Sequence, residues 1–199
     1  HQDSETRQQT YQDRVVGGGA RYRTRDSYYN EKLWAGNVQL DKHIVAGDVA
    51  QQLPYGINIK RLENSDRREG GETVLSSGVN TPVKPTSDFP DPTTWNYAVF
   101  AQDSIKLGRW TLLPGLRYDH YELSPHVTQD YLNSAATNPN PPTYSDSAWS
   151  PKFGATYPLT DELSLYGQYA AGFRAPQAVE IFGEFVNPGM YRTLANPDL

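Results

Sequence analysis

The sequence has no cysteine and no apolar run near the length of a membrane-spanning helix. Such a helix needs about 20 predominantly apolar residues, and the mean hydropathy of this chain is only -0.71. Helical membrane proteins are therefore excluded, and only a closed β-barrel would let the chain cross a membrane. The lack of cysteine fits an oxidising compartment or an outer membrane.

Concentrated charge is also missing. The net charge is -5, with lysine and arginine scattered along the chain, so nucleic acid is not an expected partner. Residues 1–5 are polar throughout and do not form a signal peptide. An outer-membrane protein must be exported, so such a chain is either processed or an internal piece of a longer protein, and we expect the internal piece.

The motifs of common enzymes are absent as well. The sequence contains no nucleophile–base pairing, no HExxH, no cluster of metal ligands and no phosphate loop. The neighbouring carboxylates Asp161 and Glu162 fall in a predicted turn, where solvation explains them. We therefore expect a protein that is not an enzyme.

What the chain has is aromatic residues and a two-residue period. Aromatics make up 12% of the sequence, including 14 tyrosines and 4 tryptophans, as suits the girdles of a membrane barrel. In residues 163–174 the odd positions are apolar, aromatic or small, and the even positions are mostly polar or small. Since successive side chains of a strand point to opposite faces, one face can meet lipid while the other lines a wet interior. A soluble, tyrosine-rich β-domain is the alternative.

The same period recurs and predicts about seven strands. They cover residues 1–11, 21–41, 51–66, 94–105, 109–121, 148–159 and 163–174. Short turns are predicted at 106–109 and 160–162, with a somewhat longer one at 43–49, and long polar loops at 67–93 and 122–147. Short turns at one end and long loops at the other are typical of outer-membrane barrels, with the long loops outside the cell. We predict an all-β fold, an antiparallel transmembrane β-barrel segment.

Seven strands do not close a barrel by themselves. Bacterial single-chain barrels have an even number of strands. Two free edges in hydrocarbon would leave unsatisfied backbone groups, at several kcal/mol each. Residues 1–199 are therefore expected to be part of one larger barrel domain, whose remaining strands lie outside this chain.

Three segments resemble a known family. They are Phe89-Pro90-Asp91 with the strand 98–103, Pro114-Gly115-Leu116-Arg117-Tyr118-Asp119, and residues 169–176 together with Asn196-Pro197-Asp198-Leu199. These strings are similar to those of TonB-dependent outer-membrane receptors. The paired Phe-Arg-Ala-Pro and Asn-Pro-Asp-Leu boxes resemble the signature of the haem/haemoglobin receptor branch, although ferric-siderophore receptors carry related boxes.

The resemblance implies a 22-stranded barrel in the bacterial outer membrane, filled by an N-terminal plug domain absent from this chain. Such receptors import an iron source with energy relayed by TonB. The implied partners are haem or a haem-carrying protein outside the cell, TonB through the plug, and outer-membrane lipid. A ferric-siderophore receptor is the alternative with the same fold, and a soluble β-rich binding module is a weaker one.

In the haem branch the loop between the two boxes usually supplies an iron ligand, often a histidine. Residues 177–195 contain no histidine but include Tyr191. A tyrosinate oxygen suits ferric haem, so Tyr191 is the candidate ligand of the haem iron, or else an ordinary loop tyrosine. His120 and His126 are further candidates for haem contact, or else solvated side chains.

Arg174 lies at the corner where the last strand enters this loop. One interpretation is a cation that meets a haem propionate. The other is an ion pair with a carboxylate such as Glu180, which would fix the corner.

Overall fold

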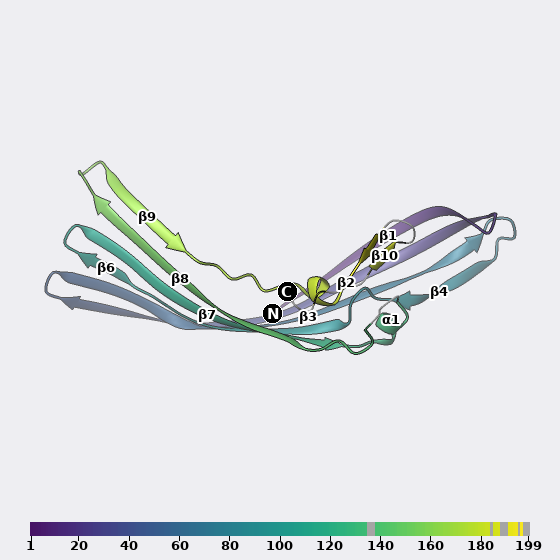
Figure 1. Ribbon diagram of the computed structural model, residues 1–199, viewed down its shortest axis with the longest axis horizontal. Helices are drawn as coiled ribbons and strands as arrows, with labels where there is room; N and C mark the ends of the chain where they lie inside the picture. The colour runs from purple at the N-terminus through teal and green to yellow at the C-terminus, as the bar shows by residue number, and fades with distance from the viewer. Residues whose placement is uncertain (135–137, 184, 188–190, 195, 197–199) are drawn as a thin grey trace.

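The computed structural model describes residues 1–134, 138–183, 185–187, 191–194 and 196. The chain forms one long, bent antiparallel sheet (Figure 1), with strands in the order β1-β2-β3-β5-β7-β8-β9. The elements are β1 (Gln2–Val16), β2 (Gly19–Ala46), β3 (Val49–Val74), β4 (Asn80–Thr86), β5 (Asp91–Gln102), β6 (Ser104–Leu107), β7 (Trp110–His126), α1 (Gln129–Leu132), β8 (Tyr144–Pro158), β9 (Ser164–Ala170), α2 (Ala178–Phe182), β10 (Phe185–Asn187) and β11 (Tyr191–Thr193).

The predicted all-β antiparallel fold is confirmed, and each predicted strand has its counterpart. β5 and β6 together are the strand predicted at 94–105, interrupted at Asp103, whose N–H donates to the carbonyl of Pro114 at 2.8 Å. Both pieces pair with β3 on one side and β7 on the other. β1 and β9 are the two edges of the described sheet, so its closure into a barrel by further strands stays a prediction.

The strand ends differ from the prediction. Residues 67–93 were predicted as a loop, but β3 continues to Val74 and β4 returns along it. β7 likewise continues to His126 in the predicted loop 122–147, and β9 ends at Ala170 rather than at 174. The β3 extension is polar on both faces and the β7 extension has one apolar residue, Leu123, so no apolar alternation marks them, although the backbone hydrogen bonds of the ladder persist.

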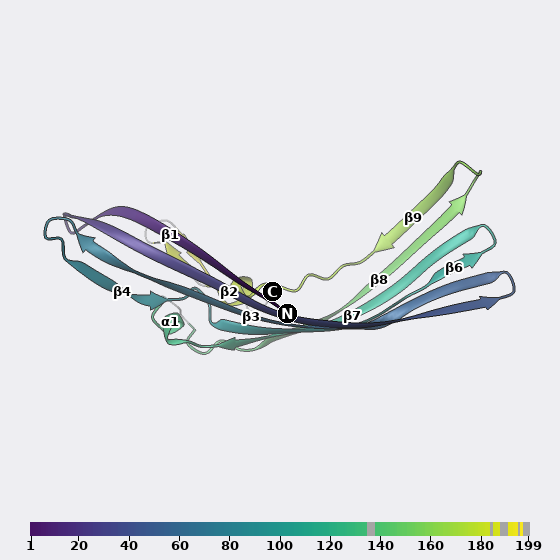
Figure 2. The same cartoon turned by 180° about the vertical axis from the view of Figure 1, so that it is seen from behind.

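The predicted sorting of the connections holds in part (Figures 1 and 2), because the two-residue turn between β1 and β2 lies at the loop end. Short turns join β2 to β3, β6 to β7 and β8 to β9 at one end. Gly47 and Gly108 give two of them the positive φ, 59° and 56°, that a tight hairpin turn requires. The other end carries the β3–β4 extension, α1 and α2, so any binding surface built by loops belongs there.

One face of the sheet, called the outer face here, carries an exposed apolar band. Val38, Ile57, Val99, Tyr118 and Trp149 lie directly opposite one another on five consecutive strands. The exposed fraction is 51% for Val99 and 63% for Trp149. Aromatic residues bound the band at both ends, with Trp34 and Trp95 toward the loop end and Trp110 and Tyr157 at the short turns.

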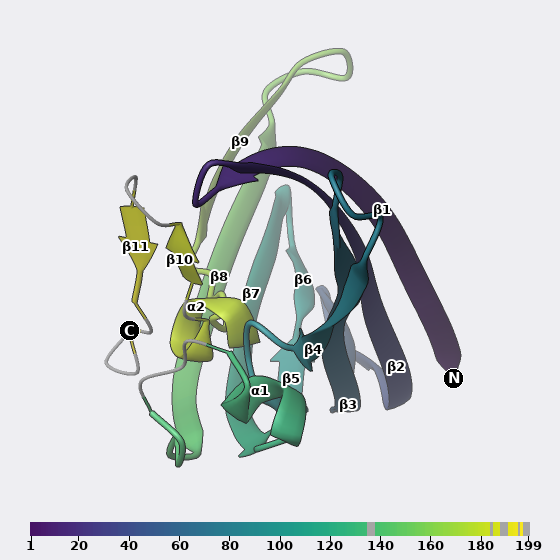
Figure 3. The same ribbon diagram turned by 90° about the vertical axis from the view of Figure 1, so that its right-hand side faces the viewer.

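The opposite, inner face holds the packed core. Tyr121 and Leu123 of β7 point to this side and contact Ile181 and Phe182 of α2, together with Phe89 from the segment before β5. Figure 1 shows α2 on the inner side of the bend in the sheet, and Figure 3 looks at the loop end, where both helices lie. Within the described residues, neither helix is long and apolar enough to span a membrane.

Candidate ligand-binding site

The chain enters the inner face after β9 through a corner fixed by Arg174. Its guanidinium donates two hydrogen bonds to the carboxylate of Glu180, each 3.0 Å long. The same carboxylate accepts the N–H of Gln177 at 2.7 Å, which closes a capping box at the start of α2. Hydrogen bonding from Arg174 holds the pKa of Glu180 below its ordinary value. The ion pair offered as one interpretation of Arg174 is therefore present, while the propionate contact stays a prediction.

α2 is held against the sheet by side chains of β7. Ile181 is completely buried, and Phe182 is buried beside it. The hydroxyl of Tyr121 donates to the carbonyl of Pro176 at 2.8 Å. Five residues are too few for a helix that is stable alone, so this packing determines where α2 lies.

Under α2 the inner face forms a cavity of about 640 Å³, called the α2 hollow. Its lining is mixed, with aromatic and aliphatic groups beside amides and charges. The lining residues are Tyr29, Glu31, Lys60, Leu62, Asn64, Phe89, Thr94, Asn96, Tyr121, Ala175, Pro176, Gln177, Ala178 and Val179. A cavity of this size with a few convergent polar groups is typical of small-molecule sites.

A second cavity of about 530 Å³, called the arginine hollow, lies further along the loop end. It shares Tyr29, Phe89 and Val179 with the α2 hollow, so the two are contiguous. The full lining is Thr6, Gln8, Thr10, Arg25, Ser27, Tyr28, Tyr29, Asp66, Arg68, Asp88, Phe89 and Val179. Together the hollows offer an elongated site, polar and charged at one end and more apolar under α2.

Tyr29 stands between the two hollows in a fixed network. The amide of Asn64 donates to the Tyr29 hydroxyl at 2.8 Å and to Glu31 at 2.9 Å. The Tyr29 hydroxyl donates to Glu31 at 3.2 Å, and its ring meets Phe89 edge-on at 6.4 Å. Burial, and then the charge of Glu31, raises the pKa of Tyr29 to about 12. The phenol is therefore neutral at physiological pH.

The segment that carries Phe89 is tied down by polar contacts. The N–H of Asp88 donates to Asp66 at 2.9 Å, and the carboxylate of Asp88 pairs with Arg68. The N–H of Ser87 donates to the carbonyl of Asp130 at 3.0 Å. Burial raises the pKa of Asp88, and Arg68 opposes that rise. Phe89 is thereby held as a fixed wall of both hollows.

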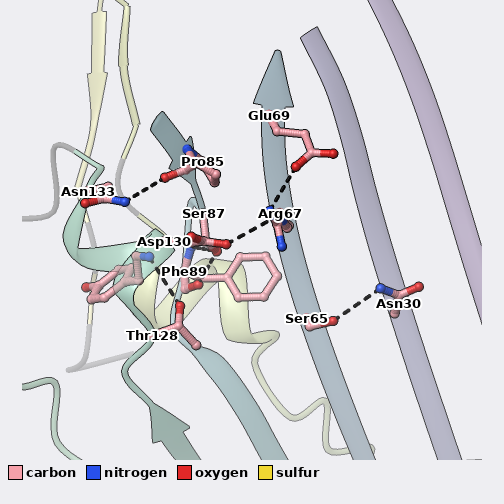
Figure 4. A network of polar contacts seen from close by, with 11 residues as sticks. Asn30, Ser65, Arg67, Glu69, Pro85, Ser87, Phe89, Thr128, Asp130 and Asn133 are labelled. Atoms are coloured by element: carbon pink, nitrogen blue, oxygen red, sulfur yellow. Dashed lines mark hydrogen bonds and ion pairs between the residues drawn. The ribbon is translucent and has the colours of Figure 1, made fainter. Parts of the chain in front are cut away.

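α1 supports this segment from behind. The Asn133 amide donates to the carbonyl of Pro85 in β4 at 3.0 Å (Figure 4). Arg67 of β3 lies 3.7 Å from the carboxylate of Asp130 and 2.9 Å from that of Glu69. The Thr128 hydroxyl caps α1 by accepting the N–H of Tyr131 at 3.2 Å. The wall that contains Phe89 is therefore braced by β3, β4 and α1.

The two candidate histidines lie on the outer face, not on the inner one. His120 is directly opposite Tyr97 on β5, whose ring stacks on it at 6.5 Å, and its Nδ1 lies 2.9 Å from the Ser147 hydroxyl. His126 has the same parity on β7, and its Nδ1 lies 3.1 Å from the carbonyl of Asp91. Neither lines the hollows, and a haem contact at these residues stays a prediction.

Tyr191 begins β11, where its backbone pairs with Asn187 of β10. Its side chain lies outside the described residues, as does 197–199 of the second box. Its role as a haem-iron ligand stays a prediction. Within the described residues no group of three or more histidine, aspartate or glutamate side chains is arranged to hold a metal ion.

Sequence reasoning missed the residues that line the hollows, above all Tyr29, Arg25, Arg68 and Phe89. The alternation in 21–41 already assigns Tyr29 and Arg25 to the face opposite Trp34. That signal was available. Arg68 and Phe89 fell in a predicted loop, and nothing in their local sequence brings them beside Tyr29.

The comparison with family models agrees with this fold. A family model described as TonB dependent receptor-like, beta-barrel, matches residues 1–199. The metal-pseudopaline receptor CntO of Pseudomonas aeruginosa, found in two strains, is 23% identical over 178 residues, which cover 84% of this chain and 25% of the receptor. This chain thus spans about a quarter of that relative's length.

A solved structure, the ferric citrate transporter FecA in its unliganded form, is 21% identical and has a TM-score of 0.45. The match covers 83% of this chain and 23% of FecA. The family match fixes the environment of the sheet, since members of this family lie in the bacterial outer membrane, where the apolar outer band meets lipid. The chain belongs to the family of TonB-dependent receptor β-barrels, which are receptors and transporters rather than enzymes.

Proposed function

We propose that this chain is the ligand-contacting part of the barrel in an outer-membrane receptor that imports an iron or other metal chelate with energy relayed by TonB. The observation that carries the proposal is the pair of contiguous hollows on the inner face at the loop end, beneath α2. Their combined size and mixed lining suit an organic chelate rather than a bare ion. CntO, to which the chain is similar, is named as a metal-pseudopaline receptor.

The test fills the site without disturbing the sheet. Val179 lines both hollows and is 49% exposed, so Val179→Trp adds bulk where a ligand would lie. In cells that rely on the full-length receptor, uptake of radiolabelled ferric or nickel chelates is expected to fall at least about tenfold, because a filled pocket cannot seat its ligand. Leu132→Trp on α1, 46% exposed and outside both hollows, is the matched control. TonB-independent uptake, or equal uptake by the Val179→Trp receptor and wild type, would contradict the proposal.

A finer proposal makes haem the chelate, taken free or from a haem-carrying protein. Its support is the pair of boxes around residues 177–195, with Tyr191 between them as the candidate iron ligand and Arg174 as a cation for a propionate. A phenolate oxygen suits ferric iron. Ferric siderophores are the competing class, and the mixed lining of the hollows is compatible with them.

Haem titration of the purified full-length receptor separates these classes. If haem is the ligand, a Soret band develops on binding, and Tyr191→Phe shifts the band and weakens the affinity at least about tenfold through loss of the ligating oxygen. Tyr166→Phe, at a position 82% exposed on β9, should leave both unchanged. Absence of a Soret band would rule out haem as the ligand. The uptake experiment would still test the wider proposal.

A further inference from the structure

An excess of arginine lies on the inner face beyond the α2 hollow, although the chain as a whole is acidic. Arg14 of β1 is directly opposite Arg21 of β2, and Arg23 and Arg25 follow on the same face of β2. Arg68 of β3 is opposite Ser27 of β2, which brings a fifth guanidinium to this face. Three carboxylates face them, namely Glu72, Asp66 and Asp88.

These carboxylates are already engaged by three of the five arginines. Arg21 lies 2.8 Å and Arg14 3.8 Å from Glu72. Arg68 pairs with Asp88 and lies 4.0 Å from Asp66. The local balance, three carboxylates against five guanidiniums, leaves two positive charges without a matching anion.

Arg23 and Arg25 are the two that remain. Neither guanidinium has a hydrogen bond or an ion pair with any residue that the structure describes. The Nε of Arg23 is buried and has no hydrogen-bond partner among them. Leaving a buried donor unpaired costs about 1–3 kcal/mol. Arg25 lines the arginine hollow, whereas Arg23 does not and acts on a ligand there through its charge.

The neighbouring cations act on Arg25 directly. Burial, followed by the charges of Arg23, Arg68 and Arg14, lowers the pKa of Arg25, and Asp88 opposes the shift only in part. The guanidiniums therefore repel one another where water is partly excluded. An anion placed between them would offset this repulsion.

The rest of the lining is suited to oxygen ligands. Hydroxyl and amide groups of Thr6, Gln8, Thr10 and Ser27 surround Arg25 in the arginine hollow. A guanidinium offers parallel N–H donors that match the two oxygens of a carboxylate. The cavity of about 530 Å³ is large enough for several carboxylate groups on one ligand.

We propose that Arg25, with the positive charge of Arg23 beside it, forms a carboxylate-binding site at the loop end of the inner face, which selects negatively charged, carboxylate-bearing metal chelates. The identity of the natural ligand rests on the proposed function. The chelate lies with its carboxylates in the arginine hollow and its less polar body in the α2 hollow, which adjoins it at Tyr29 and Phe89. Cationic chelates are rejected by the unpaired arginines.

The experiment measures thermal unfolding of the purified full-length receptor in detergent, with sodium citrate as the probe and sodium chloride at equal ionic strength as its control. A ligand that binds only the folded state raises the Tm. Citrate is expected to raise the Tm of the wild type in a saturable way, whereas chloride does not. In Arg23→Gln/Arg25→Gln the apparent affinity for citrate should fall about ten- to a hundredfold, as expected for lost charge-assisted hydrogen bonds.

Arg7→Gln is the matched control, because Arg7 of β1 lies on the other face of the sheet and is paired with Asp26. It removes one positive charge from the same region and should retain citrate binding. Arg25→Lys, which keeps the charge but loses the two-pronged geometry, should bind citrate with intermediate affinity. If the double variant does not fold, Arg25→Gln alone is measured against the same criterion.

Equal stabilisation by chloride, or citrate binding retained in the double variant, overturns this site. Inorganic phosphate is a second probe, and tighter binding of phosphate than of citrate would overturn the assignment to carboxylates. Citrate binding is measured without transport. If the receptor binds citrate through these arginines but imports no metal chelate, the carboxylate-binding site is supported and the proposed function is contradicted.

Discussion

Replacing Ile181 with aspartate is expected to release α2 from the inner face and to open the α2 hollow. Ile181 is 0% exposed and is surrounded by Phe89, Tyr121, Leu123 and Phe182. An unpaired carboxylate in such surroundings costs several kcal/mol, and a helix of five residues has no stability of its own to resist that cost. Hydrogen exchange of the full-length receptor should show protection lost across residues 171–183.

The position next to the core provides the control. Val179 lies on the same helix but is 49% exposed, so Val179→Asp introduces the same carboxylate without burying it. Its helix should stay protected. The sheet itself should unfold at the same temperature in both variants, because α2 is no part of the strand ladder. Unchanged exchange in Ile181→Asp would mean that this cluster does not hold the helix.

The strands could be predicted from the sequence wherever their two faces meet different solvents. Within the band marked by Trp34, Val99 and Trp149, one face is apolar and the other polar, and a period of two is then visible in the sequence. Beyond the band the extension of β3 is polar on both faces, and the extension of β7 has a single buried apolar residue, Leu123. The extensions of β3 and β7 therefore went unpredicted, although their backbone pairing is continuous.

The binding surface was harder to predict because it depends on register. Arg25 and Arg68 are 43 positions apart and come together only because residues of β2 and β3 pair in one particular alignment. No local pattern sets that alignment. The position of His120 on the outer face, in contrast, was already implied by the sequence. His120 is an even number of positions from Leu112, Leu116 and Tyr118, so its side chain points to the same face of the strand.

The face of the sheet to which a side chain points also determines the effect of a charge placed there. Val99 is 51% exposed, within the apolar band, and directly opposite Ile57 and Tyr118 on its neighbours. Val99→Arg would place a cation in hydrocarbon, at a cost of about 2–4 kcal/mol when it lies near the bilayer midplane. We expect a loss of this size in the free energy of unfolding of the full-length receptor, measured by urea titration in lipid vesicles.

Gln102→Arg is the matched variant, because Gln102 lies on the same strand with its side chain on the inner face. A wet interior accepts a guanidinium without the cost of entering lipid, so this variant should lose less than about 1 kcal/mol. Both variants place the same guanidinium on the same strand. The difference between their losses in free energy of unfolding therefore shows which face meets lipid and which meets water. Equal losses would mean that both faces meet water, and the apolar band would then need a protein partner rather than a membrane to cover it.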